Sequence, residues 1–282
     1  ADIYGVAAAM QFDPIEKKPL YHFYPGKEIL SLGGLGCNFH CSCCQNYEIS
    51  QSGKKGFPRL QELTIEKILA LAHSSPDNIG VAYTYNEPMV WFEFMFDIAS
   101  EISKANLRNV VVSNGYVNRE PLSQLLKYID AFNIDLKGFD NAVHKKFTGG
   151  ELKYVLQTLK AIVNAGKHLE ITFLTVPGIN DDPGLFEKMV HWIRTDLSAK
   201  IPLHISRYFP RYKSVAEPTP VALLDSLAVI AHKYLDFVYT GNVMKGDFQH
   251  TNCPKCGSVV IYREGYRIDR TGMNSKGLCN SC

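Results

Sequence analysis

Apolar runs typical of buried strands alternate with helical patterns along most of the chain. The predicted strands cover residues 28–35, 78–86, 109–113, 131–136, 169–176, 203–207 and 237–239. Apolar residues recur at helical spacing between them, from Thr64 to Pro76 and over 88–105, 121–128, 151–165, 184–197 and 221–234. Strands separated by single helices pair in parallel through right-handed crossovers. Six such units are two short of a complete barrel, so the pattern predicts an α/β fold, a partial (β/α)6 TIM-like barrel. An open doubly wound sheet has the same periodicity and is the alternative.

Length and charge limit the classes of function. The 282 residues suffice for one barrel-sized domain and a small appendage. A formal net charge of +2 argues against a partner that is a nucleic acid or an anionic membrane surface. No apolar run approaches the roughly 20 residues that span a bilayer. The apolar start, residues 1–10, lacks a basic leader and is not interpreted as a signal peptide.

The 8 cysteines fall into two tight groups, with none between Cys44 and Cys253. A secreted disulfide scaffold would distribute its cysteines through a much shorter chain. Two clusters in a large, otherwise thiol-free protein indicate metal binding in a reducing compartment. We therefore expect a cytoplasmic protein.

The first group lies in a loop that follows a glycine-rich strand end. Cys37, Cys41 and Cys44 are spaced so that three thiolates can bind three irons of a cubane 4Fe–4S cluster. The fourth iron then has no protein ligand, which is the open position that a catalytic metal needs. The alternative is a structural zinc loop that uses Cys43 or His40 as a further ligand.

Polar residues follow the predicted strands at the ends where parallel barrels carry their chemistry. Because these ends meet at one mouth of a barrel, we expect the side chains to lie together. The residues concerned are Tyr85, Asn86, Glu87, Ser113, Asn114, Asp135, Lys137 and Arg207. The remaining histidines, His204 among them, are assigned to packing or to the solvated surface.

The second group forms two CxxC knuckles, Cys253 with Cys256 and Cys279 with Cys282. Each knuckle supplies two thiolates from one turn, and together they make a closed tetrahedral site. The intervening residues predict a small hairpin, as in zinc ribbons. We expect Zn²⁺ here, in a structural or docking role; rubredoxin-like iron or an auxiliary cluster is the alternative.

The Cx3Cx2C arrangement of the first group resembles the signature of the radical S-adenosylmethionine (SAM) superfamily. The resemblance implies a 4Fe–4S cluster whose open iron chelates the amino and carboxylate groups of SAM. Cys43 stands where the superfamily commonly has an aromatic residue near the adenine. Glu87 occupies the place of the "GGE" element that holds the SAM amino group, with Tyr85 and Asn86 replacing its glycines.

Asp135 and Lys137 are similar to the "DLK" element of the glycyl-radical-enzyme activases, such as pyruvate formate-lyase activating enzyme. In that family this strand end contributes to SAM binding, which implies that Lys137 meets the SAM carboxylate and Asp135 the ribose or the substrate backbone. Phe209 lies near the position where activases often carry a SAM-contacting histidine.

Most of the chain resembles the AmmeMemoRadiSam radical SAM proteins, which are relatives of the activases. The segments that carry this resemblance are the cluster loop, the terminal CxxC pair and residues 13–22, 83–88, 133–138 and 207–210. The family name implies association with Memo-like and Ammecr-like proteins.

These observations together predict a radical SAM oxidoreductase, an anaerobic enzyme with an activase-like role as one possibility. It would take electrons from a flavodoxin or ferredoxin type donor and abstract hydrogen from a substrate that could be a protein or peptide. The alternative is a non-catalytic, zinc-containing interaction module on a barrel scaffold. The expected domains are an N-terminal extension (1–27), the partial barrel (28–247) and a four-cysteine, zinc-ribbon-like appendage (248–282).

Overall fold

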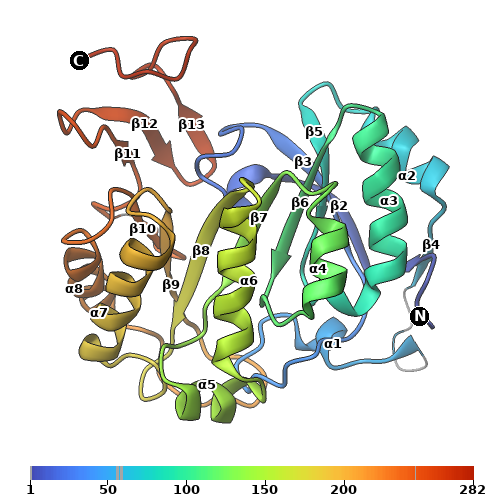
Figure 1. Ribbon diagram of the computed structural model, residues 1–282, viewed down its shortest axis with the longest axis horizontal. Coiled ribbons are helices and arrows are strands. Elements are labelled where there is room, and N and C mark those ends of the chain that lie inside the picture. The colour runs from blue at the N-terminus through green and yellow to red at the C-terminus, as the bar shows by residue number, and fades with distance from the viewer. Residues whose placement is uncertain (1, 55–56, 58–59, 245) are drawn as a thin grey trace.

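An eight-stranded sheet forms the centre of the protein. The computed structural model describes residues 2–54, 57, 60–244 and 246–282. Six consecutive pairings from β3 to β10 are parallel, and β2 joins the edge antiparallel to β3 (Figure 1). In spatial order the strands are β10 (Val238–Gly241), β9 (Leu203–Arg207), β8 (His168–Thr175), β7 (Ala131–Asp135), β6 (Arg108–Ser113), β5 (Asn78–Tyr83), β3 (Glu28–Gly33) and β2 (Ala9–Pro14).

Helices connect the parallel strands and cover the outer face of the sheet. They are α2 (Ile65–Ala72), α3 (Phe92–Lys104), α4 (Arg119–Leu125), α5 (Asn141–Thr148), α6 (Leu152–Asn164), α7 (Pro183–Trp192) and α8 (Val221–Ala231). The Thr64 and Asp182 side chains accept hydrogen bonds from backbone amides in the first turns of α2 and α7, which fixes where these helices begin. Shorter elements are β1 (Val6–Ala7), β4 (Gln61–Glu62), α1 (Tyr47–Ser50), η1 (Ile15–Lys17), η3 (Pro88–Trp91) and η4 (Ile193–Leu197). No helix in the described ranges is long and apolar enough to cross a membrane.

The strand order confirms the predicted partial barrel. The parallel strands lie side by side in the order in which the chain makes them, whereas a doubly wound sheet reverses its order at a switch point. The doubly wound alternative is therefore wrong. Strands β10 and β2 end the order, so the barrel is open along this side.

The N-terminal segment that contains Ile15 and Leu20 enters the barrel, which the sequence pattern did not predict. After β2 the chain turns through η1, and Ile15 and Leu20 become completely buried. They pack against side chains of four barrel strands, namely Ile29, Ala82, Val110 and Ala131. The inner face of the barrel is thus filled by a segment that precedes its first parallel strand.

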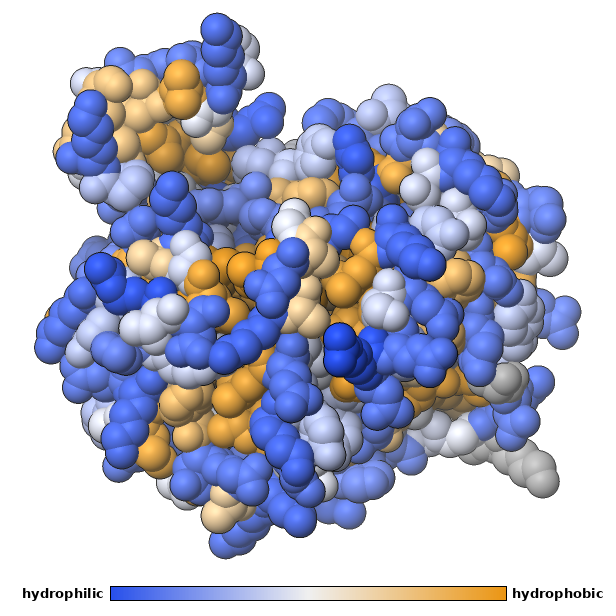
Figure 2. All heavy atoms as spheres, in the orientation of Figure 1, coloured by the Kyte–Doolittle hydropathy of each residue, from blue (hydrophilic) through white to orange (hydrophobic). Residues whose placement is uncertain are grey.

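A second, three-stranded antiparallel sheet follows the barrel. It consists of β11 (Thr251–Asn252), β12 (Val259–Glu264) and β13 (Arg267–Asp269), and it contains the hairpin predicted between the CxxC knuckles. These strands form a lobe that projects from the body of the molecule (Figures 1 and 2).

Candidate functional site

A cavity of about 420 Å³ lies at the carboxyl ends of the central strands. Its walls bring together the residues that follow β3, β5, β6 and β7 in the sequence. The predicted residues that line it are Cys37, Cys41, Cys43, Cys44, Tyr85, Asn86, Glu87, Ser113, Asn114, Asp135 and Lys137.

Arg207 is the predicted residue that the structure places elsewhere. It is not among the described residues that line this cavity. Its Nε donates to the Thr219 carbonyl over 2.8 Å, and its guanidinium carbon lies 4.8 Å from the centre of the Phe209 ring. Arg207 therefore stabilises the loop after β9.

The cysteine loop begins where β3 ends in glycines. A Cβ atom on Gly34 would lie 3.2 Å from the Trp91 ring, and Gly36 has a φ of +87°, so the chain needs glycine to turn here. Within the loop, the Phe39 amide donates to Cys37 Sγ over 3.3 Å. The Cys44 thiol lies 3.1 Å from the Ser50 hydroxyl. The cysteines are thus held on one short loop that faces the cavity.

The thiols of this loop are suited to a cationic partner. Burial raises the pKa of Cys37 to about 12, and Glu87 adds to the effect. Burial likewise raises the pKa of Cys43 to about 11 and raises the pKa of Cys41. Thiolates in such a place need compensating positive charge, which bound iron supplies. The donor set therefore fits a metal cluster at Cys37, Cys41 and Cys44.

Glu87 is a buried carboxylate that organises the next two strand ends. Its oxygens accept hydrogen bonds from the Met89 amide (3.0 Å), the Ser113 hydroxyl (2.8 Å) and the Asn114 amide (2.8 Å). Burial raises the pKa of Glu87 to about 7, although the three hydrogen bonds act to lower it. Asn114 Nδ2 lies 3.7 Å from Cys37 Sγ, so the Glu87 network reaches the cysteine loop.

Tyr85 and Asn86 take the places of the two glycines of the GGE element, and the backbone turn accommodates both side chains. Tyr85 has a φ of +72°, a left-handed conformation that glycine adopts more easily. The Asn86 side chain accepts from the Gly34 amide (3.0 Å) and donates to the Gly36 carbonyl (2.9 Å). The backbone turn is therefore kept, and the Asn86 amide connects it to the glycine-rich end of β3.

Asp135 and Lys137 form an ion pair of 3.1 Å at the end of β7. Burial opposes the charge on Lys137, but Asp135 and the Cys41 thiol raise its pKa above the ordinary range. Lys137 therefore stays cationic and provides positive charge beside the cysteines.

Sequence reasoning missed the part of the cavity wall that comes from the N-terminal segment. Asp13 and Lys18 line the cavity and form a buried ion pair of 2.6 Å. Asp13 also accepts a hydrogen bond from the Tyr85 hydroxyl, and Lys18 Nζ lies 4.4 Å from the centre of the Tyr85 ring. This contact supports the left-handed Tyr85. The only signal in the sequence was that residues 13–22 contribute to the family resemblance, and that resemblance assigned no role to Asp13 or Lys18.

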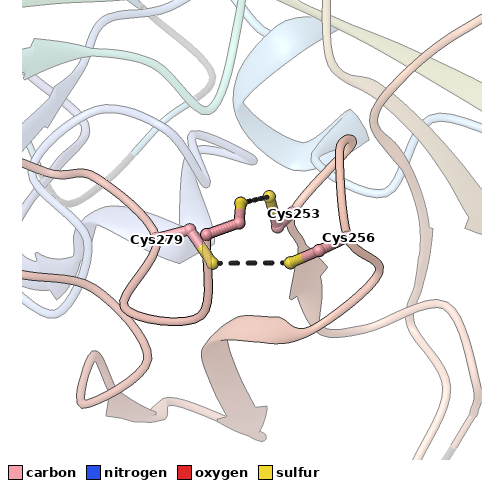
Figure 3. A group of neighbouring side chains, drawn as sticks. Cys253, Cys256 and Cys279 are labelled. Carbon is pink, nitrogen blue, oxygen red and sulfur yellow. Dashed lines mark hydrogen bonds between the residues drawn. The ribbon is translucent and has the colours of Figure 1, made fainter.

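The second cysteine group comes together in the C-terminal lobe (Figure 3). The four sulfur atoms lie within 4.8 Å of one another. Cys253 and Cys282 are 3.7 Å apart, as are Cys256 and Cys279. A sulfur tetrahedron around zinc, with bonds of about 2.3 Å, has edges of about 3.8 Å. The predicted knuckles thus form a group with the dimensions of a four-thiolate metal site.

Comparison with families and curated proteins gives several matches. The Radical SAM superfamily matches residues 32–192. An uncharacterized protein of Methanocaldococcus jannaschii is 40% identical over 265 residues, which is 92% of this chain and 77% of that protein. The 4-hydroxyphenylacetate decarboxylase activating enzyme of Clostridium scatologenes is 25% identical over 162 residues. The chain spans 50% of the length of that activating enzyme, and the match covers 55% of this chain.

Solved structures share the fold. A radical SAM methyltransferase from Sphaerobacter thermophilus superposes with a TM-score of 0.59 at 14% identity, covering 78% of this chain and 68% of that one. A domain of a pyruvate-formate lyase-activating enzyme from Bacteroides vulgatus superposes with a TM-score of 0.51 at 17% identity, covering 57% of this chain and 98% of the domain. These likenesses agree with the partial barrel described above.

Proposed function

The chain belongs to the radical SAM superfamily, and on this premise we propose that it cleaves SAM reductively at a 4Fe–4S cluster bound by Cys37, Cys41 and Cys44. The observation that carries the proposal is the set of thiols on one loop, facing a cavity that also holds Glu87 and Lys137. When bound, the reduced cluster supplies the electron that splits SAM into methionine and a 5′-deoxyadenosyl radical, which abstracts hydrogen from substrate.

The chain's own residues bind and orient SAM in this proposal. Glu87 has acceptor capacity beyond its three donors and suits the SAM ammonium. Lys137 stays charged and suits the carboxylate, and Asp135 suits the ribose or the substrate backbone. Ser113 and Asn114 are held by Glu87 at the cavity wall. Cys43 lies where the adenine is expected.

An activase-like role is the finer part of the proposal. It is supported by relatives such as the pyruvate formate-lyase 1-activating enzyme of Escherichia coli strain K12, 25% identical over 151 residues, which are 52% of this chain and 61% of that enzyme. The substrate would then be a protein or peptide, and a flavodoxin or ferredoxin type protein would supply the electron. Memo-like and Ammecr-like partners rest on the sequence resemblance alone.

The C-terminal group of four cysteines is proposed to bind Zn²⁺ in a structural or docking role. The support is the sulfur spacing together with the small size of the lobe, whose folding metal binding would favour by on the order of 10 kcal/mol. The proposed domains keep the boundaries 1–27, 28–247 and 248–282. All eight cysteines are free, which suits a reducing, cytoplasmic and oxygen-poor setting.

Anaerobic reconstitution with iron and sulfide tests the central proposal. We expect four irons and four sulfides at the first site, the electron paramagnetic resonance signal of a reduced 4Fe–4S cluster, and 5′-deoxyadenosine after addition of dithionite and SAM. Cys41→Ala should abolish 5′-deoxyadenosine formation.

Cys256→Ala is the matched control, because it removes one thiol from the other group. It should spare the cluster and SAM cleavage while lowering zinc content and solubility. A colourless protein that contains only zinc and forms no 5′-deoxyadenosine would favour the non-catalytic interaction module.

A further inference from the structure

A strained three-residue turn follows β5 at the wall of the cavity that holds the cysteine loop. The Asn86 amide donates to the Thr84 carbonyl over 3.0 Å, so Tyr85 is the central residue of a γ-turn. The Tyr85 φ of +72° places this turn in the rare class that residues with a side chain adopt at a cost. Glycine adopts such a φ freely, so a tyrosine here needs support from its surroundings.

The turn joins two groups that the proposed SAM site needs. Asn46, two residues after Cys44, donates from its Nδ2 to the Tyr85 carbonyl over 2.6 Å. On the other side of the turn, Glu87 directly follows Asn86. A change of backbone direction at Tyr85 would therefore move the cysteine loop and the Glu87 carboxylate relative to each other.

The Tyr85 side chain is held by the N-terminal segment. Its ring lies on Gly33, where a Cβ atom would be 2.9 Å from the ring carbon Cδ2. Its hydroxyl donates to the Asp13 carboxylate and accepts from Gln11 Nε2 over 2.9 Å. Burial opposes the charge on Asp13, but the hydrogen bonds from Lys18 and Tyr85 lower its pKa, so Asp13 remains an ionised acceptor.

We infer that Asp13 is a positioning residue for SAM, which acts through the Tyr85 hydroxyl to hold the turn between β5 and Glu87. The N-terminal segment thereby replaces the conformational freedom that two glycines give the GGE element. The inference rests on the proposed function, because SAM is the ligand, but SAM binding and not SAM cleavage tests it.

Isothermal titration of SAM into the reconstituted, unreduced protein measures this role, since cleavage needs an added electron. Tyr85→Phe keeps the ring but loses the bond to Asp13, so it should raise the SAM dissociation constant about fivefold to thirtyfold. Tyr85→Gly also loses this bond, yet glycine needs no support at this φ, and its constant should stay within about threefold of the wild type. Lost packing alone would give the reverse order.

Tyr83→Phe is the matched control. Tyr83 lies on β5, is completely buried and donates to Asn109 over 2.9 Å, but it is not among the described residues that line the cavity. Removal of its hydroxyl should lower stability and leave the affinity for SAM as in the wild type.

A double substitution tests whether Asp13 acts through Tyr85. Asp13→Asn should weaken SAM binding about threefold to tenfold in the wild-type protein and should cause no further loss in the Tyr85→Gly protein. If Tyr85→Gly does not fold, Tyr85→Asn takes its place, because asparagine tolerates the left-handed conformation.

The results separate this inference from the proposed function. Equal SAM affinities of the Tyr85→Phe and Tyr83→Phe proteins, or binding by Tyr85→Gly no tighter than by Tyr85→Phe, would overturn the positioning role even where the wild type forms 5′-deoxyadenosine. If the affinities follow the expected order but no 5′-deoxyadenosine forms after reduction, the positioning role stands and the enzymatic proposal fails. A wild-type protein that binds no SAM would overturn both.

Discussion

Glu170 is a completely buried carboxylate that holds the N-terminal segment inside the barrel. Its oxygens accept from the Tyr21 amide (3.0 Å), the His22 amide (2.7 Å), His168 Nε2 (2.9 Å) and His204 Nε2 (2.6 Å). The histidine contacts lower the pKa of Glu170, against the effect of burial. His204, assigned to packing or to the solvated surface from sequence, thus has a definite partner.

His22 makes stability depend on pH. Burial lowers its pKa from 6.5 to about 4, against the attraction of Glu170. Between these values the unfolded chain binds a proton that the folded protein does not, so stability falls as the pH falls from 6.5 to 4. We expect this residue to contribute a loss of up to about 3 kcal/mol in the free energy of unfolding.

Urea denaturation at several pH values measures this contribution. His22→Gln should reduce the slope of stability against pH in that window, while His191→Gln, at an exposed position, should leave the slope as in the wild type. Equal slopes for the wild type and His22→Gln would show that His22 is not the titrating group.

Single residues also mark where sequence reasoning stops. The cysteines and strand-end residues could be predicted because each lies in a short motif and a parallel barrel brings strand ends together. The positions of Asp13 and Glu16 could not be predicted, because their neighbours lie far away in the sequence. The hydrophobic pattern does not indicate that the N-terminal segment packs against those strands and loops. The left-handed Tyr85 depends on a contact with Asp13, 72 residues away.

At the scale of elements, the alternation of apolar strands and amphipathic helices was sufficient to predict the barrel. This pattern did not predict β2, because β2 precedes the alternating strands and helices and no α-helix follows it before β3. It missed α5, a short helix whose last turn contains Lys145 and Lys146. Helix α4 begins at Arg119, two residues before the predicted start at Pro121, because proline is tolerated in a first turn.

Strand β5 depends on a glycine at its parallel pairing with β6. Gly80 pairs with Arg108, and a Cβ atom on Gly80 would lie 1.9 Å from the Arg108 carbonyl oxygen. Gly80→Ala must therefore displace the strand, and we expect it to lower the free energy of unfolding by about 3 kcal/mol.

Gly53→Ala is the control for that measurement, since no atom of the residues that the structure describes lies within 4 Å of the added atom. Its midpoint of thermal unfolding should stay close to that of the wild type. A Gly80→Ala protein as stable as Gly53→Ala would contradict the described pairing.

At the scale of the whole molecule, Arg263 is one of the side chains that connect the lobe to the barrel. Arg263 on β12 donates to the Tyr21 carbonyl over 2.9 Å, and its guanidinium carbon lies 4.2 Å from the centre of the Tyr21 ring. Arg263→Met should detach the lobe and lower the free energy of unfolding by at least about 2 kcal/mol. Limited proteolysis should then cut between β10 and β11.

Arg267→Met provides the comparison, because Arg267 is exposed on the neighbouring strand β13. It should leave both the cleavage rate and the stability unchanged. If the Arg263→Met protein resists proteolysis as well as the Arg267→Met protein does, other contacts hold the lobe.

The contact between Tyr21 and Arg263 joins positions 242 residues apart. Such a distant pairing has a large loop-closure entropy cost and forms late in folding. During synthesis, the segment that fills the barrel must therefore wait, without this anchor, until β12 has left the ribosome. We expect nascent chains that end before β12 to expose this apolar segment, and so to be good clients for chaperones.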